Sequence, residues 1–121
     1  MPRDYRIYLE DMREAGEKVR RYVEGLSFEA FSSDEKTVDA VVRNLEILGE
    51  AAKQVPDLFR SAHPQVDWYR IAGLRDILIH QYFGIDLTIV WDVVQNKMPT
   101  LLQQLDQILS LPGAIHRCSK R

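Results

Sequence analysis

The sequence predicts an all-α protein built as a four-helix bundle with short extra helical turns. Long segments repeat apolar residues every three or four positions, as the buried face of a helix requires. No segment alternates apolar and polar residues with the period of two that a strand would show. Glycine and proline separate the long segments from one another, so each segment is expected to form its own helix.

The first helix is predicted over residues 3–24, where tyrosine, leucine, methionine and valine recur at helical spacing. Gly25 ends it. Residues 27–31 are then expected to form a short turn, whose two aromatic residues, Phe28 and Phe31, anchor the connection to the core.

The second helix is predicted over about residues 33–55. Ser32 is followed three residues later by Glu35, a spacing that predicts a capping box at the start of this helix. One apolar stripe runs along the segment. Pro56 ends the helix because proline lacks an N–H and disfavours a helical residue before it.

Residues 56–66 are expected to form a short helical turn and a loop before the third main helix. Asp67 is a candidate N-cap of that helix, which begins at Trp68 and runs through His80. We interpret Trp68 as an anchor in the hydrophobic core; the alternative is a platform on which an RNA base stacks.

The last long helix is predicted after Asp86, which can cap it. Leucine, valine and tryptophan form a heptad-like stripe over residues 87–109. Pro99 falls inside this run and is expected to kink or split the helix near residues 96–97. Residues 1–112 are thus expected to form one helical domain.

Length and composition are those of an ordinary soluble domain. The chain has 121 residues, a net charge of -2 and no apolar run of the roughly 20 residues that cross a membrane. Residues 113–121 show no pattern and are expected to form a flexible tail. The charged N-terminus has no signal-peptide core, so we expect a cytoplasmic protein without membrane contact.

The sequence gives no indication of a metal site or another cofactor. Its single cysteine, Cys118, cannot form an internal disulfide, and its three histidines, His63, His80 and His116, are widely scattered. The acidic balance also argues against a non-specific nucleic-acid binder, since such proteins are typically basic. It does not exclude RNA cleavage, which needs only a local positive cleft.

Three polar residues, Arg75, His80 and Tyr82, stand in an apolar stretch that ends near Gly84. Burying a guanidinium or an imidazole without partners costs several kcal/mol, so their presence indicates a function. Histidine can give or take a proton near neutral pH. Arginine offers a rigid fork of donors that fits a phosphate. Together the two side chains suit cleavage of RNA without a metal.

The spacing limits how one helix can use these residues. Arg75 and Tyr82, seven residues apart, share a face of an ideal helix, whereas His80 lies about 140° round from Arg75. Two arrangements bring Arg75 and His80 to one phosphate. The helix can end near His80, or two copies of the chain can each contribute both residues to a shared cleft about a twofold axis. We expect both.

The motif Arg75-x4-His80-x-Tyr82 resembles the signature of the HEPN superfamily, in particular its HepT-like branch. The resemblance extends in the same order over roughly residues 3–110. It includes these segments: Arg3-Asp4-Tyr5, Tyr8-Leu9-Glu10-Asp11, Arg43-Asn44-Leu45-Glu46-Ile47-Leu48-Gly49-Glu50-Ala51, Trp68, Ile71-Ala72-Gly73-Leu74-Arg75-Asp76, Ile89-Val90-Trp91 and Met98-Pro99.

This resemblance implies an up-down, HEPN-like bundle that forms homodimers. It also implies a ribonuclease toxin that is encoded beside a minimal nucleotidyltransferase (MNT-type) antitoxin and cleaves RNA, with no role for DNA. Arg75 would bind the scissile phosphate and His80 would act in general acid-base catalysis. The antitoxin would use ATP to transfer AMP to Tyr82, and the added anionic group would occupy the phosphate site and neutralise its charge.

Asp76, Glu46 and Glu50 are candidates for supporting residues. Asp76 is placed to orient Arg75 or His80, and the two glutamates could line the cleft or be surface or interface residues. Each candidate also has a structural interpretation. His80 could cap free carbonyls at a helix end, Arg75 could pair with Asp76 or Glu50, and Tyr82 could pack at a dimer interface.

A second functional hypothesis is a non-catalytic partner subunit, namely a nucleotide-binding or scaffold protein for a separate nucleotidyltransferase. The acidic charge and the absence of a broad basic patch favour it. A helical dimer without chemistry is the third hypothesis, but it leaves the polar motif unexplained.

Overall fold

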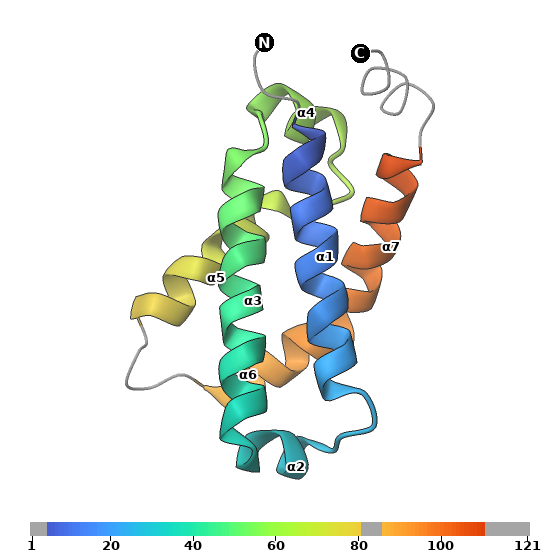
Figure 1. Ribbon diagram of the computed structural model, residues 1–121. Helices are drawn as coiled ribbons and strands as arrows, with labels where there is room; N and C mark the ends of the chain where they lie inside the picture. Colours follow the sequence, from blue (N-terminus) through green and yellow to red (C-terminus); the bar gives the residue numbers. More distant parts are fainter. Residues whose placement is uncertain (1–4, 81–85, 111–121) are drawn as a thin grey trace.

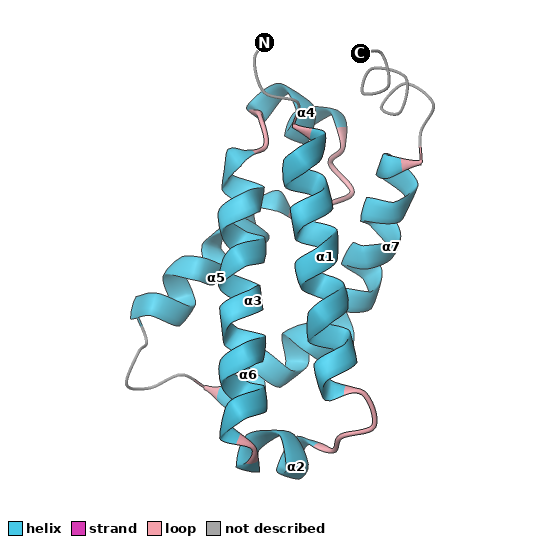
Figure 2. Cartoon of the chain, in the orientation of Figure 1, coloured by secondary structure: helices cyan, strands magenta, loops and turns pink. Residues whose placement is uncertain are grey.

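The computed structural model describes residues 5–80 and 86–110, without the side chains of residues 75 and 77–80. The elements, in chain order, are α1 (Arg6–Val23), α2 (Phe28–Ser33), α3 (Glu35–Gln54), α4 (Asp57–Ala62), α5 (Trp68–His80), α6 (Leu87–Asp92), a π-helical segment (Val93–Lys97) and α7 (Met98–Leu109). The described residues contain no strand, so the all-α prediction is confirmed for them (Figure 2).

The helices pack as a bundle around α1 (Figure 1). Helices α1 and α3 lie side by side and run in opposite directions, because α2 and its flanking turns reverse the chain between them. Helix α7 packs against α1 and also runs opposite to it. Helix α5 packs chiefly against α3 and crosses it obliquely, so its C-terminal end lies at the edge of the bundle.

One hydrophobic core joins these helices. Most of its fully buried side chains come from the predicted apolar stripes of α1, α3 and α7, and Phe31 of α2 and Val55 after α3 join them. The largest of them are Leu9, Met12, Val19, Phe31, Val41, Leu45, Leu48, Val55, Met98, Leu105 and Ile108. No helix among the described residues is long and apolar enough to cross a membrane.

A glycine in α1 allows α1 and α7 to approach closely. A Cβ atom added to Gly16 would lie 2.9 Å from both Leu102 Cδ2 and Met98 Sδ. Such a contact is far inside the van der Waals distance of about 3.5–4.0 Å between carbon atoms. Any larger residue at position 16 would therefore displace the α7 side chains.

The predicted capping box is wrong. Residues 28–33 form a full helical turn, α2, so Ser32 lies inside that helix, where its hydroxyl donates to the Glu29 carbonyl oxygen (3.3 Å). Asp34 is the N-cap of α3 instead. Its carboxylate accepts from the Thr37 backbone N–H (3.3 Å) and from the Thr37 hydroxyl (2.8 Å). The predicted aromatic anchors are confirmed, since Phe31 is buried and both Phe28 and Phe31 contact Trp91 of α6.

The predicted break before Pro99 is confirmed. The last long helix divides into α6 and α7, with the π-helical segment directly before Met98. In that segment the Met98 N–H donates to the Val93 carbonyl, five residues back. The wider turn accommodates the proline ring, which would otherwise crowd the carbonyl of the preceding turn. The predicted domain end at residue 112 and the tail over residues 113–121 lie outside the described residues.

Candidate active site

The start of α5 is fixed by its first residues. Trp68 is buried, and its Nε1–H donates to the His63 carbonyl oxygen (2.9 Å). The Asp67 carboxylate accepts a hydrogen bond from the Arg70 backbone N–H, as the side chain of an N-cap residue does. The distance of 3.4 Å is at the long end of the range for hydrogen bonds. Both predictions, the cap and the core anchor, are confirmed. The helix that carries the candidate motif is therefore held firmly at its N-terminal end.

The two predicted catalytic residues both lie on α5. Arg75 is in its middle and His80 is its last described residue. The backbone is helical throughout, so the offset of about 140° between positions 75 and 80 holds in the structure. One copy of the helix does not place both positions on one face. Tyr82 and Gly84 lie outside the described residues, so the predicted helix end near His80 is untested.

Asp76 ties α5 to α3. Its carboxylate lies 3.8 Å from Lys53 Nζ, and both side chains are partly exposed. An exposed pair of this kind is worth about 0–1 kcal/mol, so it adds little to the packing of α5 on α3. From the sequence, Arg75 and His80 were the expected neighbours of Asp76. Lys53 was not expected, because nothing in the sequence indicates how α5 is placed on α3.

Glu46 and Glu50 lie on the α3 surface beside this contact. They line a shallow groove of about 510 Å³ between α1 and α3. Glu46 is 3.9 Å from Arg43 within that groove. On a helix, residues 46, 50 and 53 follow one line, since they are four and three residues apart. The two glutamates thus share a ridge with Lys53, which contacts α5. The other residues of the groove are Tyr8, Asp11, Ile47, Ala51 and Gln54.

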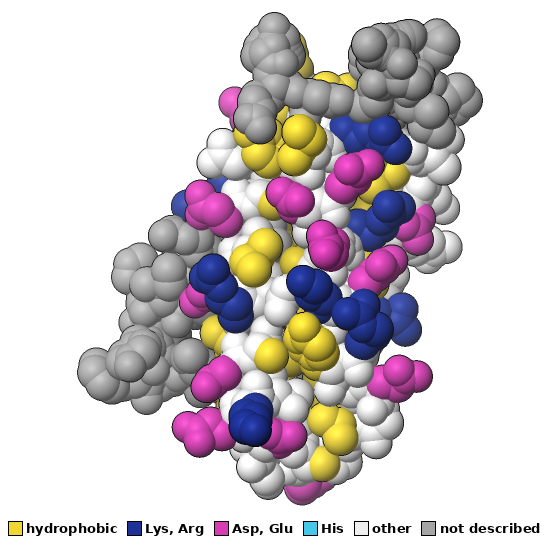
Figure 3. Space-filling model, in the orientation of Figure 1, with side chains coloured by type: hydrophobic (Ala, Val, Ile, Leu, Met, Phe, Trp, Pro, Cys, Tyr) yellow, Lys and Arg dark blue, Asp and Glu magenta, His cyan; other side chains and the backbone are white. Residues whose placement is uncertain are grey.

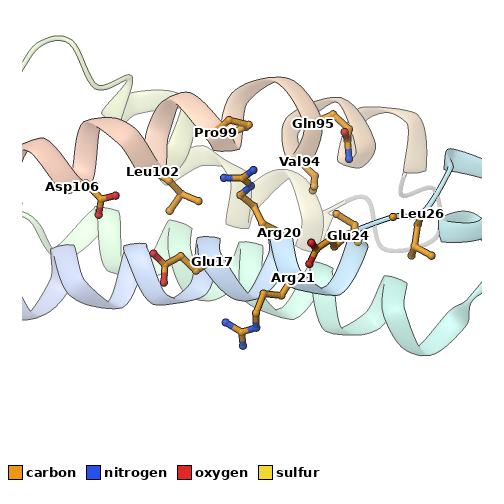
Figure 4. A pocket seen from close by; sticks show the side chains of 12 residues that line it. Glu17, Arg20, Arg21, Glu24, Leu26, Val94, Gln95, Pro99, Leu102 and Asp106 are labelled. Atoms are coloured by element: carbon orange, nitrogen blue, oxygen red, sulfur yellow. The ribbon is translucent and has the colours of Figure 1, made fainter.

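A second groove, of about 600 Å³, lies between the C-terminal part of α1 and the π-helical segment with α7. Arg20 points into it, toward Pro99, whereas Arg21 points to the opposite side of α1 (Figure 4). Glu17, Glu24 and Asp106 also line this groove, so its charges are mixed. The predicted site residues whose side chains the structure describes, Glu46, Glu50 and Asp76, do not line it.

The face that carries α1 and α3 has no broad patch of one charge. Acidic and basic side chains are interspersed over it, with apolar groups between them (Figure 3). Among the described residues, no group of histidine, cysteine, aspartate and glutamate is arranged to hold a metal ion.

Asp86 caps the start of α6, the first helix described after the candidate motif. Its carboxylate accepts from the Thr88 hydroxyl and from the Thr88 backbone N–H (2.9 Å), which caps α6. Both hydrogen bonds favour the ionised carboxylate, and they hold the pKa of Asp86 below its ordinary value. The predicted cap at this position is confirmed.

Comparison with known proteins identifies the family. The model of the family described as ribonuclease HepT-like matches residues 12–108, which include α5 as far as it is described. A probable ribonuclease HepT of Thermococcus cleftensis is 41% identical over 108 residues, which are 89% of this chain and 98% of that protein.

Two further relatives carry names that mark them as candidate RNases. One, from Methanocaldococcus jannaschii, is 42% identical over 90% of this chain and 91% of its own length. The other, from Caldanaerobacter subterraneus, is 44% identical over 86% of this chain and 93% of its own length. No solved structure matches the chain. The length and identity of these matches show that the chain belongs to the ribonuclease HepT-like family.

Proposed function

We propose that this protein is a metal-independent endoribonuclease, the toxin of a toxin–antitoxin pair of the HEPN/MNT type, and that it acts as a symmetric homodimer. The observation that carries the proposal is the family match over residues 12–108, which includes the helix that bears Arg75 and His80. The relatives named as ribonucleases align over most of their own length, which supports an activity shared by the whole chain.

The chemistry assigned to the two residues is a transesterification within RNA. A base takes the proton from a ribose 2′-hydroxyl, and the 2′-oxygen forms a bond to the neighbouring phosphorus. The bond from phosphorus to the 5′-oxygen breaks, and an acid protonates that leaving oxygen. His80 supplies acid-base catalysis, and the Arg75 guanidinium stabilises the charge that grows on the phosphate oxygens.

A dimer resolves the geometric difficulty of the motif. Positions 75 and 80 point to different sides of α5, so one helix does not readily direct both at one phosphate. Two copies of α5 about a twofold axis would bring Arg75 of one copy near His80 of the other. The oblique position of α5, whose C-terminal end lies at the edge of the bundle (Figure 1), supports a pairing at this end of the helix.

Tyr82 is the proposed site of neutralisation by a cognate nucleotidyltransferase antitoxin. Its hydroxyl would attack the α-phosphate of ATP, forming a bond to AMP with release of pyrophosphate. The adenylate would add negative charge two residues from His80. Such a group would compete with the RNA phosphate for Arg75.

The first experiment compares wild-type protein with Arg75→Ala and His80→Ala, in the presence of EDTA, on a mixed RNA substrate. Each variant should lose at least about 100-fold in cleavage rate, since one catalytic group commonly contributes that much. Circular dichroism and the urea midpoint should remain those of the wild type. Cleavage that requires an added divalent metal, or variants that fail to fold, would contradict the assigned roles.

The second experiment adds a cognate nucleotidyltransferase and ATP and follows intact mass. The mass should rise by one or more AMP units and cleavage should stop, while Tyr82→Phe should gain no AMP and stay active. Transfer of AMP to a wild-type protein that never cleaves RNA would instead identify a modified, non-catalytic partner subunit. In that case His80 would be no more than a helix cap.

A further inference from the structure

Tyr69 is the most exposed large apolar side chain among the described residues. It is 88% exposed, although the adjacent Trp68 is buried. Successive residues of a helix differ in direction by about 100°, so α5 turns one aromatic ring into the core and the next into the solvent. An exposed aromatic ring forgoes the burial that normally stabilises such a residue. The ring is therefore free to contact a partner from solvent.

The surface next to Tyr69 is open and polar. Gly73 lies one turn further along α5, and a Cβ atom added there would meet nothing within 4 Å. The Arg70 side chain is 79% exposed and lies 3.4 Å from the Asp67 carboxylate. Among the α5 side chains that the structure describes, those of residues 68–74 and 76, Tyr69 is the one large apolar side chain that is strongly exposed. The feature is thus a single aromatic ring among charged groups, beside bare helix backbone.

This surface leads toward the candidate catalytic histidine. Residues 69, 73, 76 and 80 follow one line on a helix, because eleven residues bring the chain round to within about 20° of its starting direction. Positions 69 and 80 are separated by about 16 Å along the axis, at about 1.5 Å per residue. A stacked nucleic-acid strand covers that length with about five nucleotides, at about 3.4 Å each.

We propose that Tyr69 is a stacking platform for an unpaired base of the RNA substrate, a few nucleotides from the bond that is cut. The inference rests on the proposed function, which supplies the RNA and the position of cleavage. Aromatic rings bind single-stranded RNA in this way because every base has a face on which to stack. The bare backbone at Gly73 lets the strand lie close to α5, and Arg70 offers a guanidinium to its phosphates.

The polar surroundings favour RNA over a second copy of the chain as the partner of this ring. The centre of a protein interface is usually depleted of charge and contains several apolar residues. Within four residues of Tyr69 the exposed positions are Gln65, Asp67 and Arg70, all polar, and the partly exposed Asp76 follows two turns further along α5. A lone ring among charges matches the combination of stacking and phosphate contacts that single-stranded RNA uses.

The test uses Tyr69→Ala and Tyr69→Phe in the full-length protein, with Leu58→Ala as the matched control. Leu58 on α4 is 87% exposed, so its truncation removes a comparable exposed side chain away from α5. Fluorescence anisotropy measures the binding of an unstructured RNA oligonucleotide, and cleavage assays give KM and kcat. The same oligonucleotide in a duplex, where its bases are not free to stack, is the second control.

Tyr69→Ala should weaken oligonucleotide binding and raise KM by about 5-fold to about 150-fold, the range that loss of one stacked base produces. Tyr69→Phe should stay within about 2-fold of the wild type because the ring remains. Leu58→Ala should change neither value, kcat should hold in all three variants, and duplex RNA should not respond to position 69.

Two results would overturn the inference while leaving the proposed function intact. One is wild-type binding and KM in Tyr69→Ala with normal cleavage. The other is that Tyr69→Ala weakens the dimer in sedimentation equilibrium, and that this weakening alone accounts for the loss of RNA binding. That result would assign the ring to a protein interface. A wild-type protein that binds the oligonucleotide through Tyr69 but does not cut it would support the stacking role and contradict the proposed nuclease.

Discussion

Gly16 and Gly73 show how the surroundings of a residue decide what the same substitution does. Both lie inside helices, where glycine is less favourable than alanine by about 1 kcal/mol. At position 16 a Cβ atom would press on two side chains of α7 at 2.9 Å, and both of those side chains are buried. At position 73 it would meet nothing within 4 Å.

We therefore expect Gly16→Ala and Gly73→Ala to change stability in opposite directions. Overpacking a core costs about 1–3 kcal/mol, which exceeds the gain in helix propensity, so Gly16→Ala should lower the free energy of unfolding by about 1 kcal/mol. Gly73→Ala should raise it by up to about 1 kcal/mol. Urea unfolding measures both. A Gly16→Ala protein more stable than the wild type would show that Leu102 and Met98 move aside without cost.

Single residues of the candidate site were predictable only in part. The sequence indicated that Trp68 is buried, since an apolar helix needs an anchor, and the structure confirms it. The sequence did not indicate that Tyr69 is exposed, because two adjacent aromatic residues do not reveal which of them faces the core. It also did not indicate the pairing of Lys53 with Asp76, which depends on how two helices cross.

At the scale of helices, the starts of α3 and α6 depend on aspartate caps that respond to pH. The Thr37 hydroxyl and backbone N–H both donate to Asp34, and they lower the pKa of that carboxyl below its ordinary value of 3.8. A lowered pKa in the folded state means that the ionised group stabilises the fold above pH 3.8. That contribution is lost as the pH falls through the lower folded-state value.

Asp34→Ala should therefore lower the melting temperature by a few degrees at neutral pH. The difference in melting temperature from the wild type should narrow as the pH falls from 3.8 through the lower folded-state pKa, because the carboxyl of Asp34 then becomes protonated in the folded state as well. Thermal melts of both proteins from pH 7 to pH 2.5 measure this difference in melting temperature. Asp39→Ala, which removes an exposed carboxylate from the same helix without removing a cap, should show no such loss. A constant difference across this range would mean that the charge of Asp34 contributes nothing.

Helices were more predictable than their ends. The apolar stripes predicted four main helical segments, and Pro99 correctly predicted the division of the last one, because proline has a definite steric effect. The start of α3 was misplaced since Ser32 and Asp34 are both good caps. The choice between them depended on α2, whose extra helical turn takes Ser32 into its interior.

At the scale of the whole molecule, charge limits how RNA can be held. The chain carries a net charge of -2, and basic side chains do not gather on the face formed by α1 and α3. Long-range attraction of RNA to this face is therefore expected to be weak, and the proposed function would rely on a few close contacts, for which Arg75 and the ring of Tyr69 are the proposed candidates. The proposed homodimer would double these contacts.

The proposed dimer predicts that two inactive variants restore one another. If the cleft takes Arg75 from one copy and His80 from the other, a mixture of Arg75→Ala and His80→Ala contains heterodimers with one complete site. Random exchange makes half of the dimers mixed, and each has one working site of two, so activity should recover to about a quarter of wild type.

The measurement requires subunit exchange, for example after dilution from mild denaturant, followed by RNA cleavage. Each variant treated alone is the control and should stay inactive. A second control mixes wild-type protein with the double variant Arg75→Ala/His80→Ala. A heterodimer of these two chains has no complete cross-subunit site, so the cleavage rate should fall as the double variant is added in excess over wild type. An absence of recovery from a confirmed mixture of heterodimers would show that one copy of α5 supplies both groups. The helix would then have to depart from regular geometry near His80, since an unbroken helix holds the two positions about 140° apart.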